Sequence, residues 1–140
     1  MKRIISLMLA VVMTFAFTVS VSAEELEQPT IMPRYTYIMA TGVNIYIDES
    51  TNITTNDAFF YTYDNYEVQI VCQLQRYNNS KWNTIKTWTA SGMRYVDLQE
   101  SWAVPSGYTY RTYATFKVYD SNGNLVESVS RYDSQYFPPK

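Results

Sequence analysis

The sequence contains no histidine, and Cys72 is its only cysteine. Without histidine the chain has no Ser-His or Cys-His nucleophilic pair and no zinc site built on imidazole ligands. A single cysteine excludes an internal disulfide and a thiolate metal cluster. Because Cys72 stands among alternating apolar residues, we expect a small buried hydrophobic side chain rather than a reactive thiol.

The sequence also gives little support for the pair of catalytic carboxylic acids that a glycosidase needs. Asp97 with Glu100, and Asp64 with Glu67, each supply two nearby carboxylates. Both pairs stand at or near predicted turns and strand ends, where solvated acids are common. The sequence therefore predicts a protein that is not an enzyme, with no catalytic residue, no cofactor and no metal ligand.

A strong net charge is absent, since 13 Asp and Glu stand against 11 Lys and Arg. Nucleic-acid-binding domains are normally clearly basic, so nucleic acid is not expected as a partner. The charges are nevertheless segregated: residues 24–67 hold eight acids and one Arg, whereas residues 68–96 hold four basic residues and no acid. We interpret the basic segment as a solvated strand face, with local contact to a polyanion as the alternative.

The first 23 residues have the order of a secretory signal peptide. Lys2 and Arg3 precede an uncharged apolar stretch over residues 4–17, and the segment closes on Val21-Ser22-Ala23, with small residues before the cut. A retained membrane anchor is the alternative, but the apolar run is short for a span. We expect cleavage after Ala23, secretion to the extracellular side, and no membrane span in the exported chain. Residues 24–33 are acidic and are expected to form a flexible leader.

Extended segments follow one another from Arg34 onward, in a chain with only 4 glycines but 14 tyrosines and 3 tryptophans. Residues 66–77 and 108–118 keep a period of two between apolar and polar residues, which indicates strands with one face in the core. Further strands are expected over 35–39, 43–47, 53–63, 82–89, 93–104 and 125–132. The sequence thus predicts an all-β domain over residues 34–135, an immunoglobulin-like antiparallel β-sandwich of about seven strands. A small β-barrel is the alternative, and residues 136–140 are expected to be a C-terminal tail.

Residues 120–124 carry an Asn-Gly pair of the kind that closes hairpins. Asp120, Asn122 and Asn124 also imitate the opening of an EF-hand calcium loop. That loop needs glycine at its sixth position and an acid at its twelfth. Here Gly123 is fourth and Arg131 is twelfth, so a hairpin is the expected structure.

Several separated motifs resemble one protein family. They are Leu74-Gln75-Arg76-Tyr77, Trp82, Thr87-Trp88, the run from Val104 to Arg111, and Glu127-Ser128. In this order they are similar to the pattern of small secreted proteins of Gram-positive bacteria that are grouped as a domain of unknown function. The resemblance covers most of residues 43–132. It implies an exported immunoglobulin-like sandwich, and it implies neither an activity nor a site residue.

The candidate binding residues are aromatic and basic. Alternation along residues 82–88 places Trp82 on one strand face with Lys86 and Trp88. If this face is exposed, sugars can stack on its rings and anionic groups can pair with its cations. The alternative is that Trp88 belongs to the core and Trp82 covers the rim of the sandwich. Five residues are the candidates: Tyr77, Trp82 and Tyr95 as stacking rings, and Arg76 and Lys86 as polar contacts.

We therefore expect a secreted binding module without enzymatic activity, acting at or outside the cell envelope through contact with a protein. A module that binds carbohydrate or a cell-wall polymer with its aromatic and basic face is the alternative. The two differ in one expectation. Replacement of Trp82 by alanine should abolish sugar binding, whereas association through an unpaired strand edge should survive it.

Overall fold

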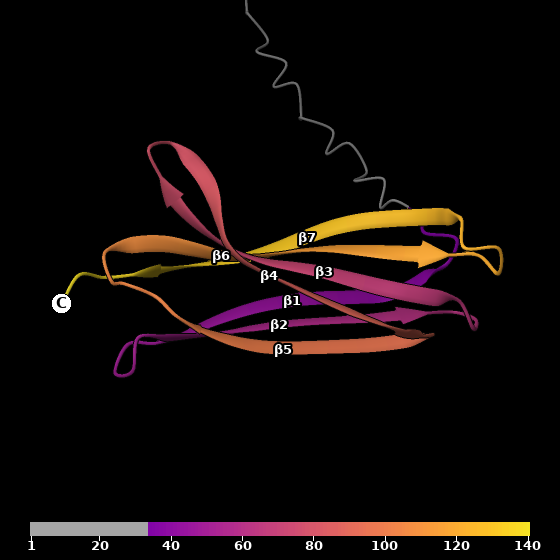
Figure 1. Ribbon diagram of the computed structural model, residues 1–140, viewed down its shortest axis with the longest axis horizontal. Helices are drawn as coiled ribbons and strands as arrows, with labels where there is room; N and C mark the ends of the chain where they lie inside the picture. The colour runs from indigo at the N-terminus through magenta and orange to yellow at the C-terminus, as the bar shows by residue number, and fades with distance from the viewer. Residues whose placement is uncertain (1–33) are drawn as a thin grey trace, which may run out of the picture. The chain divides into compact units, whose positions relative to one another are not determined.

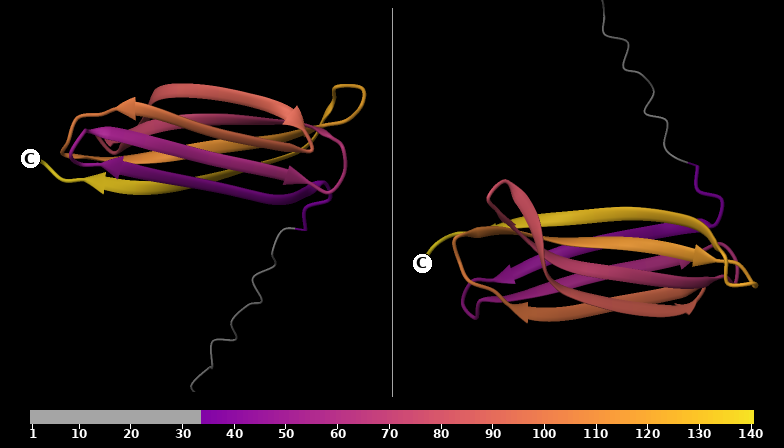
Figure 2. Two further views of the ribbon diagram at one scale, coloured as in Figure 1. Left: turned by 90° about the horizontal axis from the view of Figure 1, so that it is seen from below. Right: turned by 45° about the horizontal axis from the view of Figure 1, so that its top comes forward.

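The computed structural model describes residues 34–140. The predicted signal peptide, its cleavage after Ala23 and the leader at 24–33 lie outside the described residues. Seven antiparallel strands form two sheets packed face to face (Figures 1 and 2). They are β1 (Ile38–Asp48), β2 (Ile53–Thr62), β3 (Glu67–Asn78), β4 (Lys81–Met93), β5 (Tyr95–Ala103), β6 (Tyr108–Tyr119) and β7 (Leu125–Phe137).

The three-stranded sheet has the order β1-β2-β5, and the four-stranded sheet has the order β4-β3-β6-β7. The β1–β2, β3–β4 and β6–β7 hairpins each stay within one sheet, while the other three connections cross between the sheets. The predicted immunoglobulin-like β-sandwich is thus confirmed, and the sheets of residues 34–140 do not close into a barrel. Here β4 pairs with β3. In constant-type immunoglobulin domains the fourth strand instead pairs with the fifth strand.

Among residues 34–140 there is no helix with the length and apolarity needed to cross a membrane.

The inward faces of both sheets form two apolar clusters. One is built around Phe60 and Phe116, and the other around Leu74 and Tyr110. Trp88 is partly buried against both clusters, which confirms that it belongs to the core. Burial of each large apolar side chain contributes about 1.5–3 kcal/mol to folding, so these two clusters are the main source of stability.

A buried polar group lies between the clusters. Asn56 and Thr112 have no exposed surface, and the Thr112 hydroxyl donates to Asn56 Oδ1 at 2.7 Å, from one sheet to the other. The Asn56 amide donates to Thr54 Oγ1 at 3.1 Å and to the Glu100 carbonyl at 3.2 Å. Each polar atom of the Asn56 side chain thus has a partner, so the group joins the sheets without an unsatisfied donor or acceptor.

Tyr110 fixes the connection from β5 to β6. Its ring is buried, and its hydroxyl donates to the Pro105 carbonyl at 2.6 Å. Burial raises the pKa of Tyr110, against a smaller lowering effect of Arg76, so the hydroxyl remains a donor at neutral pH. A tyrosine that bonds back to the preceding loop in this way is characteristic of immunoglobulin-like sandwiches.

One seam between the sheets is closed by side chains of β7. The Glu127 carboxylate accepts hydrogen bonds from three consecutive backbone N–H groups, those of residues 36–38, at 2.9 Å each. Farther along, Asp133 and Gln135 accept from the N–H groups of Ile45 and Ile47 at 3.1 and 3.0 Å. These bonds use donors along the outer edge of β1, so this edge is protected against pairing with another strand.

The separate strands expected over residues 35–39 and 43–47 are replaced by one strand, β1, which runs from Ile38 to Asp48 through Gly42. The ring of Phe59 on β2 lies directly over this glycine, where a Cβ would stand 2.0 Å from Phe59 Cε1. Glycine therefore serves close packing here rather than a break.

Two other boundaries also differ from the expected ones. β4 continues through Gly92 to Met93, and the chain turns at Arg94, which has a φ of 65°. At the C-terminus β7 extends to Phe137, because this ring is buried in the core. The expected tail at 136–140 is thus shortened and begins at Pro138.

Cys72 is a free and fully buried thiol, which confirms the expected hydrophobic role. Burial raises its pKa from 9.0 to about 12. We expect no labelling of the folded protein by a thiol reagent at pH 8 and complete labelling in denaturant. Because the unfolded chain releases this proton at lower pH, stability should decrease as the pH rises from 9 toward 12. Rapid labelling of the folded protein at pH 8 would contradict this burial.

Candidate ligand-binding face

A β-bulge separates residues that the sequence placed on one face. The register between β3 and β4 shifts after Leu74, which leaves Ile85 as an extra residue on β4. Trp82 therefore faces outward, whereas Lys86 and Trp88 face inward. The prediction of a single face with all three was wrong, because an extra residue reverses the alternation beyond it.

Arg111 covers the ring of Trp82 on the outer face of the four-stranded sheet. The guanidinium carbon of Arg111 lies 4.2 Å from the centre of the Trp82 ring, and 5.0 and 5.2 Å from those of Tyr113 and Tyr132. Arg111 Nε also donates to Gln75 Oε1 at 2.7 Å. These contacts stabilise the β3–β4 hairpin against β6, and they leave Trp82 half-buried and poorly suited to sugar stacking.

The remaining four predicted site residues occupy three places. Tyr77 contacts Trp82, with 5.1 Å between ring centres. Arg76 and Lys86 lie on the opposite side of the same hairpin. Tyr95 lies on the other sheet, where it opens β5. The five residues therefore do not form one site.

Tyr95 belongs to a row of exposed rings on the outer face of the three-stranded sheet. It pairs across the strands with Tyr61, and the two ring centres are 4.4 Å apart with an angle of 33° between the planes. Phe59 follows on β2, 6.1 Å from Tyr61. The three side chains are 40–43% exposed. Because β-strand residues two apart share a face, the pleat itself holds these rings side by side.

A row of polar side chains crosses the sheet next to the rings. Register places Asn44, Asp57 and Gln99 directly opposite one another on β1, β2 and β5. Gln99 Nε2 donates to Asp57 Oδ1 at 2.8 Å, which fixes the carboxylate and leaves its second oxygen free to accept. Asn44 and Asp57, together with Gly42 and Phe59, line a shallow hollow of about 130 Å³. The face thus combines flat apolar rings with oriented hydrogen-bonding groups.

Charge distinguishes the two sheets. The strands β1, β2 and β5 contain four carboxylates and no Lys or Arg. The strands of the other sheet contain six Lys or Arg and three carboxylates. Desolvation, and then the nearby Asp97 carboxylate, raise the pKa of Tyr95. Its hydroxyl therefore stays protonated, and the ring face lies in a negative rather than positive environment.

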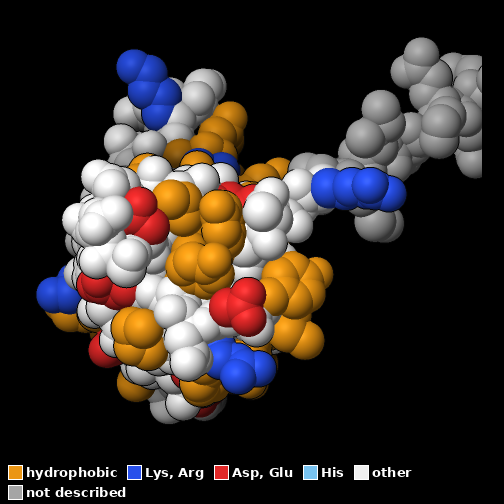
Figure 3. Space-filling view, turned by 90° about the vertical axis from the view of Figure 1, so that its right-hand side faces the viewer, with side chains coloured by type: hydrophobic (Ala, Val, Ile, Leu, Met, Phe, Trp, Pro, Cys, Tyr) orange, Lys and Arg blue, Asp and Glu red, His pale blue; other side chains and the backbone are white. Residues whose placement is uncertain are grey.

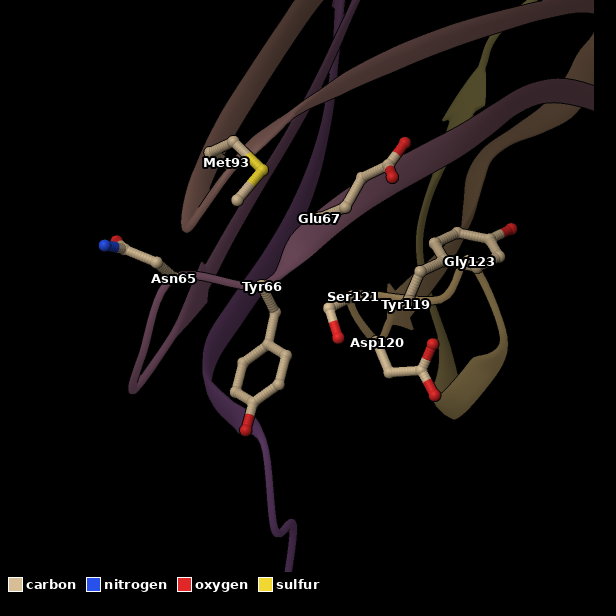
Figure 4. A pocket seen from close by; sticks show the side chains of 8 residues that line it. All are labelled: Asn65, Tyr66, Glu67, Met93, Tyr119, Asp120, Ser121 and Gly123. Carbon is tan, nitrogen blue, oxygen red and sulfur yellow. The ribbon is translucent and has the colours of Figure 1, made fainter.

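A larger cavity of about 410 Å³ lies at the end of the sandwich that Figure 3 views, where hydrophobic and acidic side chains stand side by side. Tyr119, Asp120 and Ser121 line one side, facing Met93 and residues 65–67 (Figure 4). The Asp120 carboxylate accepts from the backbone N–H groups of residues 122 and 124, which confirms the predicted hairpin loop. These bonds hold the pKa of Asp120 below its usual range. The carboxylate therefore makes its hydrogen bonds within its own loop.

Sequence reasoning missed most of the ring face. Phe59 and Tyr61 alternate with Phe60 and Thr62, so the period of two was visible. Both alternating sets contain aromatic residues, however, and the pattern alone cannot decide which set faces the core. The pairing of Tyr61 with Tyr95 joins residues 34 positions apart, and no local pattern encodes that contact.

Comparison of the chain with protein-family models, curated proteins and solved structures gave no match.

Proposed function

We propose that this protein is a secreted binding module that holds a carbohydrate chain against the outer face of its three-stranded sheet. The observation that carries the proposal is the row of exposed rings, Phe59, Tyr61 and Tyr95, beside the polar row of Asn44, Asp57 and Gln99. Sugar rings have apolar C–H faces and a rim of hydroxyls. The aromatic rings can stack against the C–H faces, and the amide and carboxylate groups can form hydrogen bonds with the hydroxyls.

Charge restricts the class of carbohydrate. Because β1, β2 and β5 carry carboxylates and no Lys or Arg, a strongly anionic polysaccharide would be repelled from this face. A neutral polysaccharide, or one with amino groups, is the ligand that the face favours. This proposal differs from the leading expectation of a protein partner, which would use the same exposed rings without needing the fixed Asp57 carboxylate.

The test is retention of residues 24–140 on insoluble neutral polysaccharides and on cell wall. We expect Tyr61→Ala and Tyr95→Ala each to weaken binding about tenfold or more, as removal of a central aromatic contact does at other interfaces. Binding should resist salt, because stacking is only weakly screened. Thermal unfolding of each variant checks that the sheet is intact.

Tyr132→Ala is the matched control, since Tyr132 is an exposed tyrosine on the outer face of the opposite sheet. It should bind like the unmodified protein. Equal losses in Tyr61→Ala and Tyr132→Ala, or loss in Trp82→Ala alone, would place the ligand elsewhere. No retention on any polysaccharide would overturn the proposal and direct the search to protein partners.

A further inference from the structure

The β3–β4 hairpin has a second, cationic side that the ring face does not use. The hairpin stands away from the body of the sandwich at one end (Figure 1). Its outward side carries Tyr77 and Trp82, whereas Arg76 and Lys86 lie on the opposite side, near Lys81 at the turn. Residues 68–96, which include all of the hairpin except Glu67 at the start of β3, contain no Asp or Glu.

Arg76 is held by an aromatic ring rather than by a carboxylate. Its guanidinium carbon lies 4.6 Å from the centre of the Tyr108 ring, and the side chain is half-buried. Arg76 Nε is buried and has no hydrogen-bond partner. A buried donor without an acceptor is destabilising. When such a group occurs in a native structure, one explanation is a bound ion.

Lys86, like Arg76, lies over an aromatic ring. Its Nζ lies 4.6 Å from the centre of the Trp102 ring on β5, and that ring is 41% exposed. Lys86 pairs with Leu74, and Arg76 is two residues farther on β3. The two cations therefore lie on the same side of the hairpin, before and after the β-bulge. Of the two acids on β5, Asp97 and Glu100, Glu100 shares a strand face with Trp102 because it is two residues away.

We propose that Arg76 and Lys86 form an anion-binding site for an oxyanion group, phosphate or carboxylate, of a polymer. Aromatic rings orient both cations, but a ring quadrupole is not a counter-ion, so each cation can still pair with an anion. The planar guanidinium of Arg76 supplies paired donors that match an oxyanion, and Lys86 adds a point charge. The site is distinct from the ring face, so one chain can contact a neutral polysaccharide and an anionic polymer at separate places.

The experiment follows the Arg76 Nε–Hε resonance by NMR in residues 24–140. Inorganic phosphate, a poly(glycerol phosphate) chain and oligogalacturonate are added in separate titrations, and calorimetry gives the affinities of the two polymers. We expect the resonance to shift with at least one polymer, and the tighter polymer identifies phosphate or carboxylate as the source. Raising the salt concentration should weaken binding. Absence of any shift at low salt would overturn the proposal.

Variants separate the site from general attraction to positive charge. Arg76→Met and Lys86→Met keep an apolar stem over the rings and should weaken polymer binding about tenfold and fivefold. Lys117→Met removes a cation from the outer face of the same sheet and should change binding less than about twofold. Equal losses in all three would overturn a defined site. Tyr61→Ala should leave polyanion binding unchanged, so failure here and failure of the polysaccharide proposal are distinguishable.

Discussion

Replacement of Asn56 by alanine is expected to lower the free energy of unfolding by about 3 kcal/mol, a large loss for one surface-inaccessible polar residue. The substitution leaves the Thr112 hydroxyl and the Glu100 carbonyl without their Asn56 partners and opens a cavity between the two apolar clusters. Urea unfolding followed by tryptophan fluorescence measures the loss. Asn44→Ala on the exposed face of the same sheet is the control and should cost less than about 0.5 kcal/mol.

A double replacement tests whether the hydrogen bond between Asn56 and Thr112 causes this loss of stability. Asn56→Leu alone leaves Thr112 unpaired, whereas Asn56→Leu with Thr112→Val removes both partners of the bond. The double variant should therefore be more stable than the sum of the two single losses predicts, by about 1 kcal/mol. Strict additivity would mean that the Asn56–Thr112 contact does not couple the sheets energetically.

The position of this bond explains how the fold manages without a disulfide. In antibody domains the tyrosine that bonds back to the preceding loop stands two residues before a cysteine of the disulfide between the sheets. Here Tyr110 makes that bond and Thr112 follows two residues later, hydrogen-bonded to Asn56 on the other sheet. A fully satisfied polar pair thus joins the sheets at the place of the covalent link.

Glu127→Gln is expected to destabilise the protein by about 2 kcal/mol. The carboxylate of Glu127 accepts three backbone hydrogen bonds with its two oxygens. A glutamine keeps the shape but replaces one acceptor by a donor that faces N–H groups. Hydrogen exchange should show loss of protection at the amides of residues 36–38, with little change in the four-stranded sheet.

Asp133→Asn is the control for Glu127→Gln, because Asp133 makes fewer hydrogen bonds to the β1 side of the same seam. Asp133 accepts one bond from the β1 backbone, from Ile45 at 3.1 Å, and its second oxygen accepts from Ser134. We expect a cost of about 1 kcal/mol, which is smaller than that of Glu127→Gln. If Asp133→Asn were the more damaging of the two, the three bonds of Glu127 would not be what holds residues 36–38 in place.

The sequence by itself determined the class of fold and much of the core. Alternation in residues 66–77 and 108–118 places Ile70, Leu74 and Phe116 on inward faces, and all three are buried. The turns at 78–81 and 120–124 also follow from local chemistry, since Asn79, Ser80 and Gly123 adopt positive φ angles. A period of two and a turn propensity are properties of neighbouring residues, so they can be recognised without knowledge of strand pairing.

The composition of the candidate faces was decided only by the tertiary structure. The extra residue Ile85 moves Trp82 and Lys86 to opposite sides of one hairpin, and no local pattern marks the position of a bulge. The ring row arises because Tyr61 and Tyr95 meet across two strands, while Gly42 gives the Phe59 ring its place. These contacts depend on register between distant segments. Register is set by the packing of the whole sandwich, because a shift of one residue would turn every inward side chain outward.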